Sequence, residues 1–146
     1  MKNKRKDSIR TGTAIVEFAL VAPLLMFMLA AVLDGAMLLR YATTAGDAAR
    51  SGAQYGSMSA SNAADTAGMQ SAALNTAIGM TGMTATAVRS CQCSGGSSVS
   101  CTGSCTGGKM LIYVQVTTRV TAPTVFGYSG LSLSGAIART ASMRAQ

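Results

Sequence analysis

The spacing of apolar and polar residues predicts one membrane-spanning helix near the N-terminus. From Phe18 to Leu33 no side chain is charged, and after Asp34 the segment GAMLL extends the apolar run to Leu39. A helix over residues 14–39 is about 39 Å long at 1.5 Å per residue, whereas the hydrocarbon core of a bilayer is about 30 Å thick. The run is therefore long enough to cross a membrane.

Small residues continue the helical pattern beyond this run, as far as about Tyr55. They form two strips with a period of four, along which another element can approach the helix backbone closely. The strips fit packing against sibling subunits and packing against this protein's own sheet, and the pattern leaves both interpretations open. Asp47 and Arg50, three residues apart, are expected to form a solvent-exposed ion pair. The first strip consists of Ala45, Ala49 and Ala53, and the second of Ala48, Gly52 and Gly56.

After the connector GSMSASN, the pattern predicts a short second helix. We expect Ser61 or Asn62 to cap a helix that runs to about Ile78, with Gly79 and Gly82 at its end. Its weak apolar face consists of Ala63, Ala67, Leu74 and Ile78.

The last third of the chain predicts a small antiparallel sheet. Residues 84–94 and 109–122 have the composition of strands and flank a Gly/Ser/Cys loop, which predicts a hairpin with a long connection. Apolar and polar residues alternate in the second strand, so one face is buried and the other is solvated, and Pro123 ends it. Residues 131–142 are expected to form a third strand, with Leu131, Leu133 and Ile137 on one side. The buried set of the second strand is Ile112, Val114, Val116 and Val120, and the solvated set is Tyr113, Gln115, Arg119 and Thr121.

Composition limits the chemistry that the chain can perform. It has 146 residues, of which 49% are apolar and 12% are charged, and none is His or Trp. The usual proton shuttle near neutral pH is therefore missing, and no paired carboxylates, activated nucleophile or phosphate-binding glycine loop is evident. The ten methionines form no repeated Met-x-x-Met cluster, so we interpret them as gap fillers rather than copper ligands. We expect a single domain that is not an enzyme and that binds no cofactor and no metal.

The net charge of +7 is concentrated at the N-terminus. The first twelve residues hold five basic side chains and Asp7, a net charge of +4. A basic cluster beside an apolar run keeps the tail in the cytoplasm and puts everything after about Arg40 across the membrane. No groove-reading element or aromatic platform follows, so we expect no nucleic-acid partner. A cleavable secretory signal is the competing interpretation, but residues 14–47 contain no Ala-x-Ala pair and the run is long for such a signal.

Four cysteines lie in or beside the predicted hairpin loop. On the far side of the membrane the compartment is oxidising, and an even number of cysteines in a small domain there favours disulfides. Cys91 and Cys93 share one face of a strand, where a direct bond between them is strained, so each is expected to pair with Cys101 or Cys105. Zinc is the alternative ligand, but this spacing is not a common finger spacing and no His assists.

The junction between the basic tail and the apolar run resembles the processing signal of type IV prepilins. Gly12 ends the tail, Glu17 is the fifth residue after it, and the aromatic Phe18 follows. In that family a membrane-embedded prepilin peptidase cleaves after the glycine, on the cytoplasmic side. The resemblance implies that the mature chain starts at Thr13.

A longer stretch, about residues 10–56, is similar to the TadE-like family of minor pseudopilins from Tad/Flp pilus systems. The shared features are a VEFAL-type block, a proline inside the span, an acidic residue near its far end and an AAR-x-GA-x-Y block. The resemblance implies that Glu17 and Phe18 matter for assembly. The matching residues are Val16, Glu17, Phe18, Ala19, Leu20, Pro23, Asp34, Ala48, Ala49, Arg50, Gly52, Ala53 and Tyr55.

Two acidic residues of the apolar run need an explanation, because a carboxylate in hydrocarbon is costly. After cleavage, the free amine of Thr13 in one subunit can meet Glu17 of a neighbour, in an ion pair that sets register more than stability. Capping of the helix start is the alternative role for Glu17. Asp34 either lies in the far interfacial zone or bonds to a partner helix.

These features together predict an α+β membrane-anchored protein that is pilin-like in outline. It has a basic leader (1–12), a transmembrane helix with its extension (13–56), and an extracytoplasmic α+β domain (57–146) with a Cys-rich loop at 91–105. A long N-terminal helix, a short second helix and a small antiparallel sheet make up the fold.

The resemblance implies a minor pseudopilin that supports assembly of a Tad/Flp-type pilus used in adhesion. It implies a bacterial inner-membrane location, with a cytoplasmic N-terminus and a periplasmic C-terminal domain. The expected partners are a prepilin peptidase, related pseudopilins, the major pilin, the inner-membrane assembly platform and membrane lipid. The alternative is a membrane-anchored or secreted envelope domain, stapled by disulfides, that acts as an adhesin or receptor.

Overall fold

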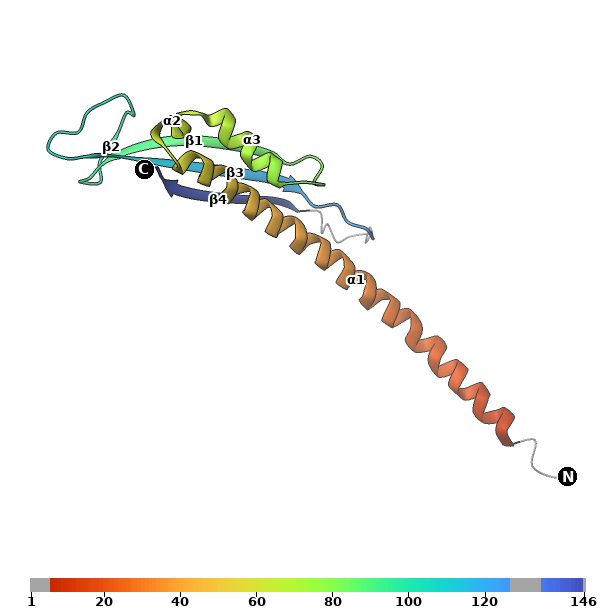
Figure 1. Cartoon of the computed structure of the whole chain (residues 1–146). Helices are drawn as coiled ribbons and strands as arrows, with labels where there is room; N and C mark the ends of the chain where they lie inside the picture. The colour runs from red at the N-terminus through yellow and green to blue at the C-terminus, as the bar shows by residue number, and fades with distance from the viewer. Residues whose placement is uncertain (1–5, 127–134, 146) are drawn as a thin grey trace.

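A computed structural model describes residues 6–126 and 135–145, with side chains from Ala14 onward. A long helix lies with its C-terminal half along a four-stranded sheet, while its N-terminal half projects away from the rest of the fold (Figure 1). This arrangement confirms the predicted α+β class. The elements are α1 (Lys6–Ser57), α2 (Ala60–Ala64), α3 (Thr66–Thr76), β1 (Thr84–Cys93), β2 (Ser98–Val99), β3 (Met110–Thr121) and β4 (Ala136–Arg144). We call the described residues that follow α1 the head.

Helix α1 continues without a break through Pro23 and ends close to the predicted Tyr55. Proline lacks an amide hydrogen, so it removes one hydrogen bond of the helix, yet the helical course is kept on both sides. The most apolar window of this helix has a mean hydropathy of 2.4, and none of that window is buried in the fold. A core helix of a soluble protein with this hydropathy is normally covered by its own chain, so α1 is a candidate membrane span by length, composition and exposure.

The sheet is antiparallel throughout, with the strand order β2-β1-β3-β4. Strands β1 and β3 form the predicted hairpin, with Thr84 opposite Arg119 and Cys93 opposite Met110. Strand β4 is the predicted third strand, and Ile137 lies on it, half-buried. Leu131 and Leu133 lie outside the described residues. The short strand β2 was not expected from the sequence.

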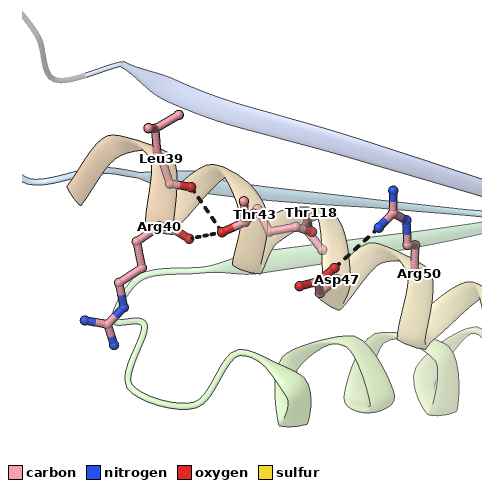
Figure 2. A network of polar contacts seen from close by, with 7 residues as sticks. Leu39, Arg40, Thr43, Asp47, Arg50 and Thr118 are labelled. Atoms are coloured by element: carbon pink, nitrogen blue, oxygen red, sulfur yellow. Dashed lines mark hydrogen bonds and ion pairs between the residues drawn. The ribbon is translucent and has the colours of Figure 1, made fainter. Parts of the chain in front are cut away.

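The core lies between one face of the sheet and the helices α1 and α3. The predicted alternation of β3 is confirmed from Val114 onward, because Val114, Val116 and Val120 are buried while Gln115 and Arg119 are exposed. It does not extend to Ile112 and Tyr113, which are both half-buried. Thr118 occupies the same buried face, and its hydroxyl donates a 2.7 Å hydrogen bond to the carbonyl oxygen of Ala45 in α1. Figure 2 shows Thr118 reaching toward the helix at this point. A buried hydroxyl is therefore paired with a helix carbonyl, as burial requires.

The segment predicted as one second helix consists of two helices, and the predicted caps are wrong. Ser59 caps α2 by accepting from the amide of Asn62, and Asp65 caps α3 by accepting from the amide of Gly68. Because the helix restarts at Asp65, the buried face shifts from the predicted one. The buried residues are Ala63, Met69, Ala73 and Ala77, whereas Ala67, Leu74 and Ile78 are exposed.

Candidate functional site: the membrane helix and its junction with the head

The first half of α1 presents apolar side chains all around its surface. The large apolar residues from Ile15 to Leu33 that are described as exposed keep about half or more of their surface accessible. The assembly candidates Glu17 and Phe18 lie within this part, and both side chains are exposed. Gly12 and Thr13 are helical in their backbone. In the full-length chain α1 begins about three turns before Glu17, so the carboxylate lies away from the helix start, whereas a chain that begins at Thr13 would place Glu17 about one turn from it.

Asp34 is buried, with 6% of its surface exposed, and it bonds to the backbone of its own chain. Its Oδ1 accepts from the amide of Val125 at 2.8 Å, and the amide of Phe126 lies 3.4 Å from Oδ1 and 3.3 Å from Oδ2. Asp34 thus bonds to the segment that follows β3 in its own chain, rather than to a partner helix, which was one of the two expectations for it. We call these three residues the Asp34 clasp. The clasp joins the apolar half of α1 to the head.

The small-residue strips pack within this chain, which decides between the two interpretations left open by the sequence. Ala45, Ala48, Ala49 and Ala53 are buried against the sheet and α3. Gly52 lies so close to α3 that a Cβ atom there would be 2.6 Å from the carbonyl oxygen of Met69. The AAR-x-GA-x-Y block is therefore largely a docking surface for the head.

Tyr55, the last residue of that block, fixes the start of α3. Its hydroxyl donates a 3.0 Å hydrogen bond to Oδ2 of Asp65, while Oδ1 of Asp65 accepts from the amide of Gly68 at 2.8 Å. The amide of Gly68 and then the hydroxyl of Tyr55 lower the pKa of Asp65 below its ordinary value. The same carboxylate raises the pKa of Tyr55, because it accepts a hydrogen bond from the protonated phenol. The interaction ties the end of α1 to the first turn of α3.

Three polar residues between these two contacts, Thr43, Asp47 and Arg50, face away from the core. Asp47 and Arg50 form the predicted exposed ion pair, with 3.4 Å between the carboxylate and the guanidinium. The hydroxyl of Thr43 donates to the carbonyl oxygens of Leu39 and Arg40, at 3.1 and 3.0 Å. Figure 2 shows these contacts along one stretch of α1, with the side chain of Arg40 pointing away from the helix. Arg50 therefore differs from its neighbours in the family block, because it does not pack against the head.

The cysteines form two disulfides, Cys91–Cys101 and Cys93–Cys105. This confirms that Cys91 and Cys93 each pair with Cys101 or Cys105, and it decides between the two pairings left open. With all four thiols oxidised, the zinc alternative for these residues is contradicted. The loop is thus covalently closed at the end of the head that lies far from the N-terminal half of α1 (Figure 1).

Comparison with protein families gives a match to the family described as TadE-like protein, over residues 12–54. The matched segment contains the exposed half of α1, Asp34 of the clasp, and the docking surface up to the residue before Tyr55. The resemblance read from the sequence is confirmed over this segment. No curated protein and no solved structure matches the chain.

Proposed function

We propose, because residues 12–54 match the TadE-like family, that this chain is a Tad pilus-associated membrane protein that acts as a minor pseudopilin. The observation that carries the proposal is the exposed, apolar first half of α1 within the matched segment. An apolar surface of this extent is not stable in water and must be covered by lipid or by other apolar helices. A pilus-type assembly provides both kinds of cover.

The proposed topology follows from charge and redox chemistry. The basic tail remains in the cytoplasm, and the head lies on the outer side of the inner membrane. Two disulfides in a small domain are typical of such an oxidising compartment, which supports this orientation. The head then stands directly above the bilayer, at the end of the span.

Processing after Gly12 would leave Thr13 as the first residue of a helix that is already formed in this region. In the assembled state, the new amine of one subunit would lie near Glu17 of its neighbour. The exposure of Glu17 supports this role, because the carboxylate is accessible to a group from outside the chain. The proposed partners are the prepilin peptidase, related pseudopilins, the major pilin and the assembly platform. We also propose that the chain performs no catalysis and acts through these contacts.

The mature N-terminus is the most direct test of the proposal. Mass spectrometry of membrane-extracted protein should find a chain that begins at Thr13. A chain that begins beyond Gly35 would have lost Asp34 and the clasp, and it would favour a secreted envelope domain instead. That result, or an intact Met1, would overturn the proposal.

Substitution of Glu17 tests the assembly role separately. The variant Glu17→Ala should insert into the membrane normally but form few pili, because the carboxylate that sets the register is gone. Asp47→Ala is the matched control, since it removes another exposed carboxylate from the same helix outside the apolar half. Normal pili in the Glu17→Ala variant, or equal loss in both variants, would contradict the role of Glu17.

A further inference from the structure

The head meets the apolar run of α1 at a defined depth. This depth follows from the membrane topology of the proposed function, on which the inference rests. A helix needs about 20 residues to cross a hydrocarbon core of about 30 Å. A span that starts at Ala14 then ends at about Leu33, and one that starts after Glu17 ends at about Met37. Asp34 lies between these limits, so the Asp34 clasp lies at the outer boundary of the hydrocarbon.

Two apolar side chains are exposed at this same level. Val125 keeps 55% of its surface exposed and Phe126 keeps 42%, although their backbone amides are bound to Asp34. In Figure 1 the segment that follows β3 is the part of the head that reaches farthest toward the N-terminal half of α1. Residues 122–124 of this segment line a small recess together with Ala31 and Leu38 of α1. The segment therefore lies along the outer end of the span.

The clasp also lowers the cost of contact between this segment and lipid, because it pairs two of the segment's polar backbone groups. After β3 ends at Thr121, the backbone leaves the sheet, and irregular backbone does not tolerate hydrocarbon unless its polar groups are paired. Asp34 accepts the amide hydrogens of Val125 and Phe126 in this segment. These amides in turn satisfy a carboxylate that would otherwise be costly at this depth.

We propose that Val125 and Phe126 form a second membrane contact of this chain, a lipid-facing anchor that Asp34 holds against the end of the span. The occupant of this surface is the lipid bilayer itself, at the level where the acyl chains meet their carbonyl groups. Continuity with the exposed apolar surface of α1 supports lipid as the occupant. Arg40, exposed and about 9 Å beyond Asp34 along the helix, lies at the level of the lipid phosphates and completes the contact.

Tryptophan fluorescence in vesicles tests this anchor, because the chain contains no Trp of its own. The full chain carrying Val125→Trp or Phe126→Trp is reconstituted into phosphatidylethanolamine and phosphatidylglycerol vesicles, with and without bromine on the acyl chains. Val88→Trp is the matched control, since Val88 is 59% exposed on the face of the sheet turned away from α1. We expect blue-shifted emission and strong quenching by brominated lipid at positions 125 and 126, and neither effect at position 88.

Other outcomes separate a failure of the proposed membrane topology from a failure of the anchor alone. If alkaline extraction removes the chain from the vesicles, the membrane topology of the proposed function fails, and the anchor fails with it. If the chain is retained but positions 125 and 126 are quenched no more than position 88, only the anchor is overturned. Blue-shifted emission without quenching would also overturn it, in favour of a protein that covers this surface.

The role of Asp34 has its own test in the Phe126→Trp background. The second change Asp34→Ala leaves two amides without an acceptor and should lower the quenching. Asp34→Asn keeps one carboxamide oxygen to accept them and should retain most of it. Equal quenching in all three proteins would contradict the role of the clasp in holding the anchor.

Discussion

Replacing Gly52 with alanine should destabilise the head, whereas the same change at Gly46, less than two turns earlier on α1, should stabilise it. At position 52 the new Cβ would lie 2.6 Å from the carbonyl oxygen of Met69 and 3.1 Å from side-chain atoms of Ala73 and Val116. A backbone carbonyl cannot turn aside as the end of a flexible side chain can, so α3 must move. Overpacking of this kind costs about 1–3 kcal/mol.

The control position isolates this cost. At Gly46 a Cβ would meet nothing within 4 Å, so the substitution there changes only the helix propensity. That gain is about 1 kcal/mol in the free energy of unfolding, and it applies at both positions. The two variants should therefore differ in stability by the overpacking term alone, about 1–3 kcal/mol.

Thermal unfolding of the full chain in detergent micelles, with the disulfides intact, measures the difference. Near-ultraviolet circular dichroism reports on the packing of the head, because Tyr41 and Tyr55 pack against its core. For a domain of about 100 residues, 1 kcal/mol shifts Tm by about 4–8 °C. Gly46→Ala should raise Tm, and Gly52→Ala should melt at least about 4 °C below it. If both variants melt together, or Gly52→Ala melts higher, the close approach of α3 is not the reason for glycine at this position.

Three further predictions concern the head. Thr118→Val should lower the free energy of unfolding by about 1 kcal/mol, because a helix carbonyl loses its 2.7 Å hydrogen bond, and an unchanged urea midpoint would contradict this. Removing the Cys91–Cys101 disulfide by double alanine substitution should cost less than the roughly 3 kcal/mol expected for an isolated loop of this length, because the second disulfide closes an overlapping loop. Removing both disulfides should then cost more than the two single losses added together in urea unfolding, and simple additivity would refute the argument. Because folding lowers the pKa of Asp65, its interactions stabilise the head fully at pH values above the ordinary carboxyl pKa of the unfolded chain. This stabilisation is lost as the pH falls through the lower pKa of the folded state. Tyr55→Phe should raise the pKa of Asp65 toward its ordinary value without reaching it, because a backbone amide still bonds the carboxylate, and an NMR titration that shows no change would refute this.

The elements that could be predicted from the sequence are those in which burial follows a regular period. The apolar run of α1 and the alternation of Val114 and Val116 in β3 both reflect one partner surface that repeats along the element. Thr118 could have been predicted in the same way, because it occupies the position between Val116 and Val120 on the buried face. Thr118 was left out of the predicted buried set because its side chain is polar. A hydroxyl can nevertheless be buried when it has an acceptor, as this one has.

The contacts that could not be predicted depend on residues far apart in the chain. Asp34 and Val125 are 91 residues apart, and no local pattern marks the amides after β3 as partners of a carboxylate in α1. The disulfide pairing was likewise open, because the sequence did not reveal β2. Pairing of Val99 in β2 with Cys91 brings the following residues back beside β1, so that Cys101 meets Cys91. The start of a new helix at Asp65 was not predicted, because a cap competes with helix continuation at a single residue.

In the proposed topology, the unbroken course of α1 from Lys6 to Ser57 makes the span and the helix under the sheet parts of one continuous element. A bilayer whose thickness does not match the apolar run changes the inclination of the helix, and the sheet packed along the same helix inclines with it. Withdrawal of the helix by one residue of its rise lifts the head by about 1.5 Å, and a turn of the helix swings the sheet around the membrane normal. A pull or a turn applied to the helix within the lipid would thus be carried to the sheet outside it, because the helix is continuous along its described length.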